Sequence, residues 1–267
     1  MAAHTYKTAM AVGAHPDDIE FLMAGTLLKL KEAGLDIHMW NFANGYCGTA
    51  TMTREEIIAA RWAEAQEAAR DAGATLHKPV VDDLAIIYDL DLLAKASAVI
   101  REVKPDILLL PSLQDYMEDH QTTGRLLVTA AFARAMMPYK TSPRVDPWGG
   151  DVFIYHAMPS GLRDQMRKLV RGGQYVDVSP QMDTKRTMLA KHRSQKEWLD
   201  VSQGMDSYII FMEGMCRDIG AMSGRFEYAE GWRRHSHLGF SGEDKDPLTE
   251  LLGPACWVDP EYENSLG

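Results

Sequence analysis

The sequence contains few cysteines and no closely spaced pair of them. Its three cysteines, Cys47, Cys216 and Cys256, are scattered along the chain and form no C-x-x-C motif. An odd, dispersed set predicts neither a disulfide framework nor a thiolate zinc site. We therefore expect the protein in a reducing compartment, the cytoplasm.

Long apolar runs and an excess of positive charge are also lacking. No stretch reaches the roughly 18 uninterrupted apolar residues of a transmembrane helix, and the first ten residues do not form a signal peptide. Lys and Arg number 28 against 38 Asp and Glu, which gives a formal net charge of −10 and a pI near 5.4. Because a negative field repels phosphates, neither nucleic acid nor an anionic membrane is expected as the main partner.

The first apolar run, residues 8–14, is not followed by the G-x-G-x-x-G pattern that binds dinucleotides. A nucleotide-dependent enzyme is therefore disfavoured. What the sequence does have is enough length, 267 residues, and enough apolar residues, 46%, to bury a full core. We expect one domain over residues 1–267.

Apolar spacing alternates between strand and helix periods through residue 137. The pattern predicts strands near 8–14, 35–45, 78–82 and 106–112, and helices over 17–34, 53–72, 90–103 and 122–137. Such alternation predicts an α/β core, about 8–137, with an open, mostly parallel, Rossmann-like sheet covered by helices on both faces.

After a Pro- and Gly-rich connection over residues 139–151, a C-terminal α/β elaboration is expected over about 150–267. Its predicted strands lie near 152–158 and 174–179, and its predicted helices near 180–199 and 204–221. From residue 224 onwards no strong periodicity is present.

Ionisable side chains follow two of the predicted strands. His15 and Asp18 stand three residues apart in HPDD, where the first strand gives way to a helix, and His120 ends MEDH beyond another strand. Carboxyl ends of parallel strands are where ligands bind in open α/β sheets. Two imidazoles and a carboxylate suit a zinc ion that keeps one position for water. Asp119, next to His120, is a candidate catalytic residue that orients the site.

Asp17 lies beside a candidate ligand without being needed as one. It is a candidate general base that takes a proton from a zinc-bound water. The alternative is that HPDD is only a turn and a helix start, in which the aspartates cap free amides, and that His120 caps the helix near Gln121. The occurrence of two such clusters at two strand ends favours the metal site.

These residues resemble the LmbE-like or PIG-L-like zinc-dependent N-deacetylases, which act on compounds that contain N-acetylglucosamine. VGAHPDDIE…AGTLLKLKEAG is similar to the family's opening motif, and DYMEDHQTTGR to its second motif. The resemblance extends over about residues 8–250. It implies that His15, Asp18 and His120 hold zinc and that Asp17 is the general base.

The resemblance further implies that Arg61, in RWAEAQEAARDAG, reaches substrate, although by default this arginine would pair with a glutamate on its own helix. One departure concerns the family's histidine three positions before the third ligand, which is Met117 here. Methionine donates no hydrogen bond, and a lost oxyanion donor costs about 3 kcal/mol in the transition state. The residues that could supply the missing hydrogen bond are Tyr116, His192, His235 and His237. Together with Arg61, the candidate substrate-binding residues are Tyr116, His192 and His237. By default the three histidines are ordinary surface or partly buried residues.

The sequence thus predicts a metal-dependent hydrolase that removes an N-acyl group, with acetyl expected, from an N-acetylglucosamine-type sugar or conjugate. Its expected cofactor is Zn²⁺, with Fe²⁺ as another divalent metal that fits the ligands. Relatives are often oligomers, so the resemblance also implies a homo-oligomer. The alternative is a sugar- or metal-binding family member whose deacetylase activity is altered or lost because of Met117.

Overall fold

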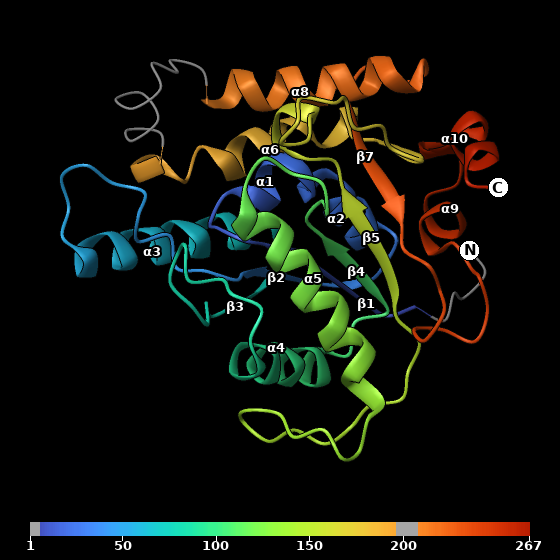
Figure 1. The fold of residues 1–267 in the computed structure, drawn as a ribbon. Coiled ribbons are helices and arrows are strands. Elements are labelled where there is room, and N and C mark those ends of the chain that lie inside the picture. The colour runs from blue at the N-terminus through green and yellow to red at the C-terminus, as the bar shows by residue number, and fades with distance from the viewer. Residues whose placement is uncertain (1–5, 196–207) are drawn as a thin grey trace.

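The computed structural model describes residues 6–195 and 208–267, and an eight-stranded sheet forms its centre (Figure 1). The strand order is β3-β2-β1-β4-β5-β7-β6-β8. The strands are β1 (Thr8–Gly13), β2 (Asp36–Asn41), β3 (Thr75–His77), β4 (Ile107–Leu110), β5 (Phe153–Ala157), β6 (Gln174–Asp177), β7 (Ala229–Arg234) and β8 (Cys256–Val258).

Strands β3, β2, β1, β4 and β5 are parallel, and the pairs β5–β7, β6–β7 and β6–β8 are antiparallel. The α-helices are α1 (Asp18–Leu22), α2 (Ala24–Glu32), α3 (Arg54–Ala72), α4 (Leu90–Val103), α5 (Glu118–Phe132), α6 (Met182–Leu189), α8 (Tyr208–Ser223), α9 (Pro247–Leu252) and α10 (Pro260–Ser265). The short 3₁₀ helices are η1 (Ala133–Ala135), η2 (Ser160–Leu162), η3 (Ser179–Gln181) and η4 (Gly253–Ala255).

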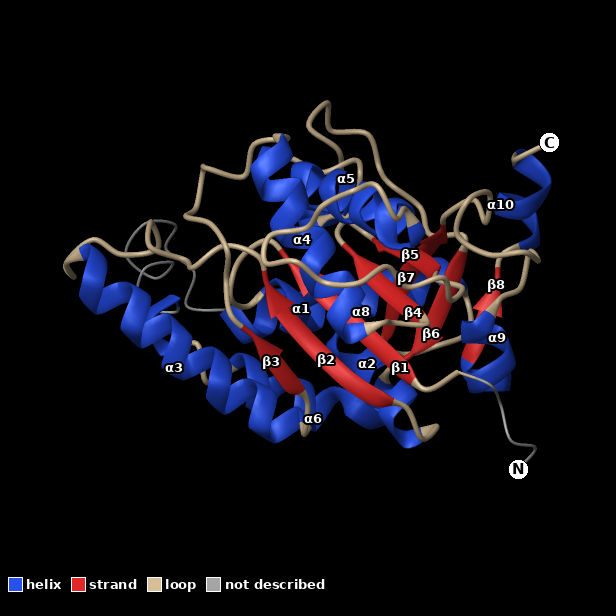
Figure 2. Cartoon of the chain, turned by 90° about the horizontal axis from the view of Figure 1, so that it is seen from below, coloured by secondary structure: helices blue, strands red, loops and turns tan. Residues whose placement is uncertain are grey.

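Both faces of the sheet are covered, as Figures 1 and 2 show. Side chains alternate along each buried strand: Ala9 and Ala11 of β1 enter the core under α1, α2, α3, α6 and α8, whereas Met10 and Val12 enter the core under α4 and α5. The predicted α/β fold with an open, mostly parallel sheet is confirmed. No helix in the described part of the chain is long and apolar enough to cross a membrane.

The best predicted elements carry clear local signals. Thr53 caps α3 in a capping box with Glu56, and Gly73 ends the helix with φ of 65°. Helix α4 has the predicted bounds, with the Asp89 side chain accepting from the Leu92 amide at its start. These local rules therefore set the bounds of both helices.

Other elements differ from the prediction. The helix predicted over 17–34 is interrupted at Met23, whose φ of −136° is not helical, so it forms α1 and α2. The strand predicted near 78–82 lies instead at β3, because Pro79 has no N–H for a ladder, and only an isolated bridge joins Ala43 to Val81. Helix α5 begins at Glu118, four residues before the predicted start.

In the C-terminal part, the predicted strands correspond to β5 and β6. Helix α6 ends at Leu189, and the predicted helical residues 196–199 and 204–207 lie outside the described residues. Beyond residue 224, where no periodicity was found, the structure contains β7, β8, α9 and α10. Strand β7 is too mixed in polarity, AEGWRR, to reveal its four buried positions.

Candidate metal centre

The candidate centre lies where the direction of strand order reverses. From β1 the chain builds β2 and β3 on one side and then crosses to β4 on the other, so the carboxyl ends of β1 and β4 flank an open crevice. At the end of β1 the chain turns tightly into α1. Gly13 permits this turn, because a Cβ there would lie 2.8 Å from the Asp18 Cβ.

Three side chains converge at this crevice. His15 and Asp18 come from the turn after β1, and His120 comes from the first turn of α5, after β4. One donor atom from each lies within 4.8 Å of the others, and the His120 Nε2 is 3.4 Å from Asp18 Oδ1. Two imidazole nitrogens and a carboxylate oxygen fit a zinc ion with an open position.

Two further carboxylates orient the histidines. Asp115 Oδ1 lies 3.0 Å from His120 Nδ1, and Asp119 Oδ2 lies 3.1 Å from His15 Nε2. Asp119 is itself held by the Leu84 amide, which donates to Oδ2 at 2.8 Å. A carboxylate on one ring nitrogen leaves the other nitrogen free to bind a metal. Asp115 is a group whose role the sequence did not predict.

The charges of this cluster hold protons on the histidines. Burial lowers the pKa of His15, but hydrogen bonds to Asp119 and Asp18 outweigh burial and raise this pKa to about 9. Burial likewise opposes protonation of His120, whereas the negative Asp18 raises its pKa well above the usual value. Because metal-binding histidines must be neutral, a metal ion would have to displace these protons.

Asp17 lies next to Asp18 in the chain and has a strained backbone conformation, with φ of 111°. Its side chain is buried, and its Oδ2 accepts a hydrogen bond of 2.5 Å from the Tyr208 hydroxyl and lies 3.5 Å from Arg61 Nη2. Burial raises the pKa of Asp17, and the positive Arg61 opposes this shift. No motif marks Tyr208, the first residue of α8, so the sequence did not reveal it.

Arg61 reaches the centre from the middle of α3 and is buried. Its Nη2 donates to the Pro16 carbonyl at 2.5 Å, and its Nη1 donates to Gln195 Oε1 at 2.7 Å. The pairing with a glutamate of its own helix, its default role, is not formed in the described part of the chain. Glu64 instead accepts from the Ser194 amide and hydroxyl.

A cavity of about 500 Å³ opens over the centre. The candidate residues among its lining residues are His15, Asp17, Asp18, Arg61, Tyr116, Met117 and His120. The Tyr116 ring packs edge-on against His120, with ring centroids 5.9 Å apart.

His192 and His237 are not among the described residues that line this cavity. His192 is fully buried, with Nε2 3.1 Å from Glu20 Oε1, and His237 lies 3.6 Å from Asp244. His235, the remaining candidate for the missing donor, packs against His156 instead. Of the four residues that could compensate for Met117, Tyr116 is therefore the one that lines the metal-centre cavity.

The fold and the site together define an α/β protein with a three-ligand candidate metal centre at the switch point of its sheet. Residues 10–131 match the family described as PIG-L: GlcNAc-PI de-N-acetylase, which supports the resemblance to the PIG-L (LmbE-like) family. The matched segment begins within β1 and ends one residue before the end of α5, and it contains all three candidate ligands and Asp17.

Similar proteins include enzymes of two kinds. Diacetylchitobiose deacetylase of Thermococcus kodakarensis is 26% identical over 238 residues, 85% of this chain and 82% of the relative. 4-Oxalmesaconate hydratase of Pseudomonas putida is 28% identical over 147 residues, 52% of this chain and 57% of the relative. The solved structure of N,N'-diacetylchitobiose deacetylase from Pyrococcus horikoshii has the same fold, with a TM-score of 0.74, 21% identity, and coverage of 91% of this chain and 89% of that one.

Proposed function

We propose that the protein is a zinc-dependent deacetylase that hydrolyses the N-acyl group, acetyl in the first instance, of an N-acetylglucosamine-type sugar or conjugate. The observation that carries the proposal is the meeting of His15, Asp18 and His120 with the carboxylate of Asp17 in one cavity. The match of residues 10–131 to the PIG-L family and the similarity to a diacetylchitobiose deacetylase support the substrate class. The free cysteines support a cytoplasmic location, and a homo-oligomer remains part of the proposal.

A zinc ion, or Fe²⁺ in its place, would be held by His15, Asp18 and His120 and would polarise the acyl carbonyl and acidify water. Asp17 takes a proton from the attacking water as its oxygen bonds to the acyl carbon. Tyr208 and Arg61 both face Oδ2 of this carboxylate, which leaves Oδ1 to act. The C–N bond then breaks, and the nitrogen receives the proton from Asp17. The products are a free amine and a carboxylic acid.

Tyr116 supplies the hydrogen bond that Met117 does not. It follows β4 in the same loop, lines the cavity and contacts the His120 ring. Tyr116 is 59% exposed, and partial desolvation together with the negative Asp18 and Asp115 raises its pKa, so its hydroxyl keeps its proton at neutral pH. A neutral hydroxyl can donate to the oxygen that becomes negative as water attacks.

The experiment is an amine-release assay over N-acetylglucosamine, diacetylchitobiose and N-acylated sugar conjugates, with the metal content of each sample measured. The wild-type protein should release amine, Asp17→Asn should keep its metal but lose turnover, and His120→Ala should lose both. Full activity of Asp17→Asn on a good substrate would show that the assigned base is wrong.

A second candidate function is addition of water to a carbon–carbon double bond of a small unsaturated acid. Two observations favour it: Met117 stands where the deacetylase histidine is expected, and a hydratase is among the similar proteins. Among the described residues that line the metal-centre cavity, Arg61 is the arginine, and it could face a substrate carboxylate. Hydration of an unsaturated dicarboxylate without any amine release from N-acyl sugars would favour this function over deacetylation.

A further inference from the structure

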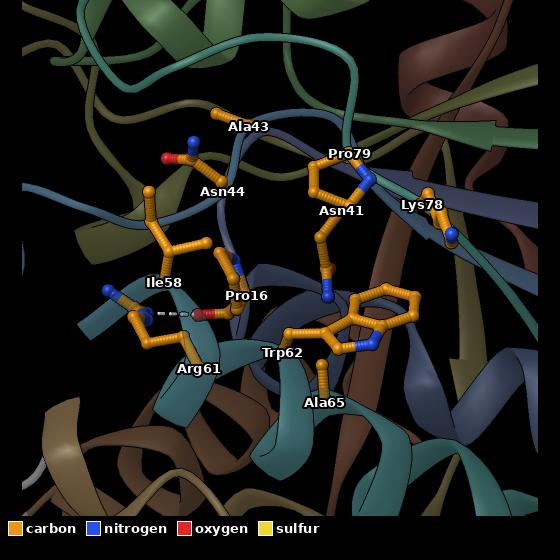
Figure 3. Close-up of a pocket in the computed structure, with 10 residues that line it drawn as sticks. All are labelled: Pro16, Asn41, Ala43, Asn44, Ile58, Arg61, Trp62, Ala65, Lys78 and Pro79. Atoms are coloured by element: carbon orange, nitrogen blue, oxygen red, sulfur yellow. Dashed lines mark hydrogen bonds between the residues drawn. The ribbon is translucent and has the colours of Figure 1, made fainter. Parts of the chain in front are cut away.

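A second cavity, of about 300 Å³, lies next to the metal-centre cavity and shares Arg61 with it (Figure 3). It is lined by the carboxyl end of β2, by one face of α3 and by the chain that follows β3. Its volume is at the lower end of the range for small-molecule sites. The lining residues that matter here are Asn41, Ile58, Trp62, Ala65 and Pro79.

Asn41 is a buried polar residue of this cavity, which Asn44, Arg61 and Lys78 also line. It is the last residue of β2 and points to the same face of the sheet as Ile37 and Met39, which are buried in the core beneath α3. Asn41 is 3% exposed, and neither its Nδ2 nor its Oδ1 has a hydrogen-bond partner among the described residues. A buried amide without partners costs about 1–3 kcal/mol for each unsatisfied group. An apolar residue would therefore stabilise this position better than asparagine, unless a ligand pairs with it.

The neighbouring Asn44 shows the contrast. It also lines the cavity, but its Nδ2 donates to Asp82 Oδ1 at 2.5 Å and its backbone amide donates to the Val81 carbonyl. Asn44 therefore has a structural role in fixing the loop after β2. Among the described residues Asn41 has no such partner, so its amide is free for a ligand.

The walls around Asn41 set the shape and the chemistry of that ligand. Ile58, Trp62 and Ala65 follow one face of α3 at spacings of four and three residues, and Pro79 lies opposite. Figure 3 shows the Asn41 amide directed toward the Trp62 ring. A flat ring fits against such walls, because stacked aromatic and aliphatic surfaces bury apolar area.

The Oδ1 and Nδ2 atoms of the Asn41 amide lie side by side; Oδ1 accepts hydrogen bonds and Nδ2 donates them. A partner that pairs with both must offer a donor and an acceptor on one edge, as a primary carboxamide or a lactam does. The N-acetyl group of a sugar is a trans amide, whose N–H and C=O point in opposite directions, so it cannot pair with both ends. The cavity therefore suits a different molecule from the substrate of the metal centre.

We propose that this cavity is a binding site for a small planar ring compound with a primary carboxamide or lactam edge, held by Asn41 and packed against Trp62. The site does not depend on the proposed deacetylase activity.

The test titrates the metal-loaded protein with benzamide, a primary carboxamide, and with 2-pyridone, a lactam, by ligand-observed NMR. Acetophenone keeps the ring and the acceptor of benzamide but has no donor. At least one of the two amides should bind about tenfold more tightly than acetophenone, and which one does identifies the edge. Binding of acetophenone as tight as that of both amides would overturn the proposal, and this comparison needs no variant.

Variants then locate the site. Ala65→Leu fills the cavity from α3, whereas Ala63→Leu makes the same change at an exposed position of that helix. The first should weaken binding of the preferred amide about tenfold and the second should not. Asn41→Leu should abolish the preference of the protein for the amide over acetophenone. Asp17→Asn should bind the amide with the affinity of the wild type. Equal affinities of the Ala65→Leu and Ala63→Leu proteins would contradict the assigned location.

Discussion

Tyr208→Phe removes the hydroxyl that donates a hydrogen bond to Asp17, the proposed general base. The hydroxyl donates to Asp17 Oδ2 at 2.5 Å in a fully buried environment, and Arg61 is the other group that faces this oxygen. A hydrogen bond to a charged group contributes about 1.5–3 kcal/mol. If that free energy holds the carboxylate in its reactive orientation, kcat should fall about 10- to 150-fold. The metal ligands are untouched, so metal content should not change.

Tyr155→Phe provides the matched control. The Tyr155 hydroxyl, on β5, also donates to a carboxylate, Asp246 Oδ1, at 2.7 Å, and neither residue lines the metal-centre cavity. Steady-state kinetics, metal analysis and urea unfolding should be measured for both variants. Both should lose stability, but only Tyr208→Phe should lose kcat, with KM little changed. Equal kcat values for Tyr208→Phe and the wild type would refute the idea that Tyr208 orients Asp17.

Three further changes test other parts of the structure. Asp115→Ala removes the partner of His120 Nδ1 and should weaken metal binding about 10- to 100-fold in a chelator competition, and a wild-type affinity would contradict its orienting role. Gly13→Ala places a Cβ 2.8 Å from Asp18 and should lower both stability and metal content, whereas a normal metal content would show that the turn can adjust. Burial lowers the pKa of His156 from 6.5 to about 4, so protons on this residue favour the unfolded chain. The contribution of His156 to stability, present in full above pH 6.5, should therefore fall by about 2 kcal/mol between pH 8 and pH 5. In urea unfolding, His156→Gln should show a smaller loss over this range, and an unchanged loss would assign it to other groups.

The sequence predicts the parallel core well because the relevant signals are local. Alternating faces in β1 and the caps of α3 and α4 can each be recognised within a few residues. Candidate ligands were recognisable because His15 and Asp18 follow one apolar run and His120 follows the loop after another. The antiparallel strands β7 and β8 were missed because they are short or mixed in polarity, and their partners come from distant parts of the chain.

The groups that surround the candidate ligands could not be predicted in the same way. Tyr208 is 191 residues from Asp17 in the chain, and only the folded structure brings the two together. In the sequence, Asn41 is only one polar residue at the end of β2. That its amide has no partner among the described residues depends on what α3 and the chain after β3 place around it.

The left-handed backbone of Asp17 bears on how this chain can change over time. A φ of 111° is a conformation that glycine adopts without strain and aspartate does not. Asp17→Gly would therefore relax the backbone while removing the carboxylate that the proposed chemistry needs. Where the reaction is no longer under selection, this position should drift toward glycine, so the residue found there in related chains reports whether selection still maintains the activity.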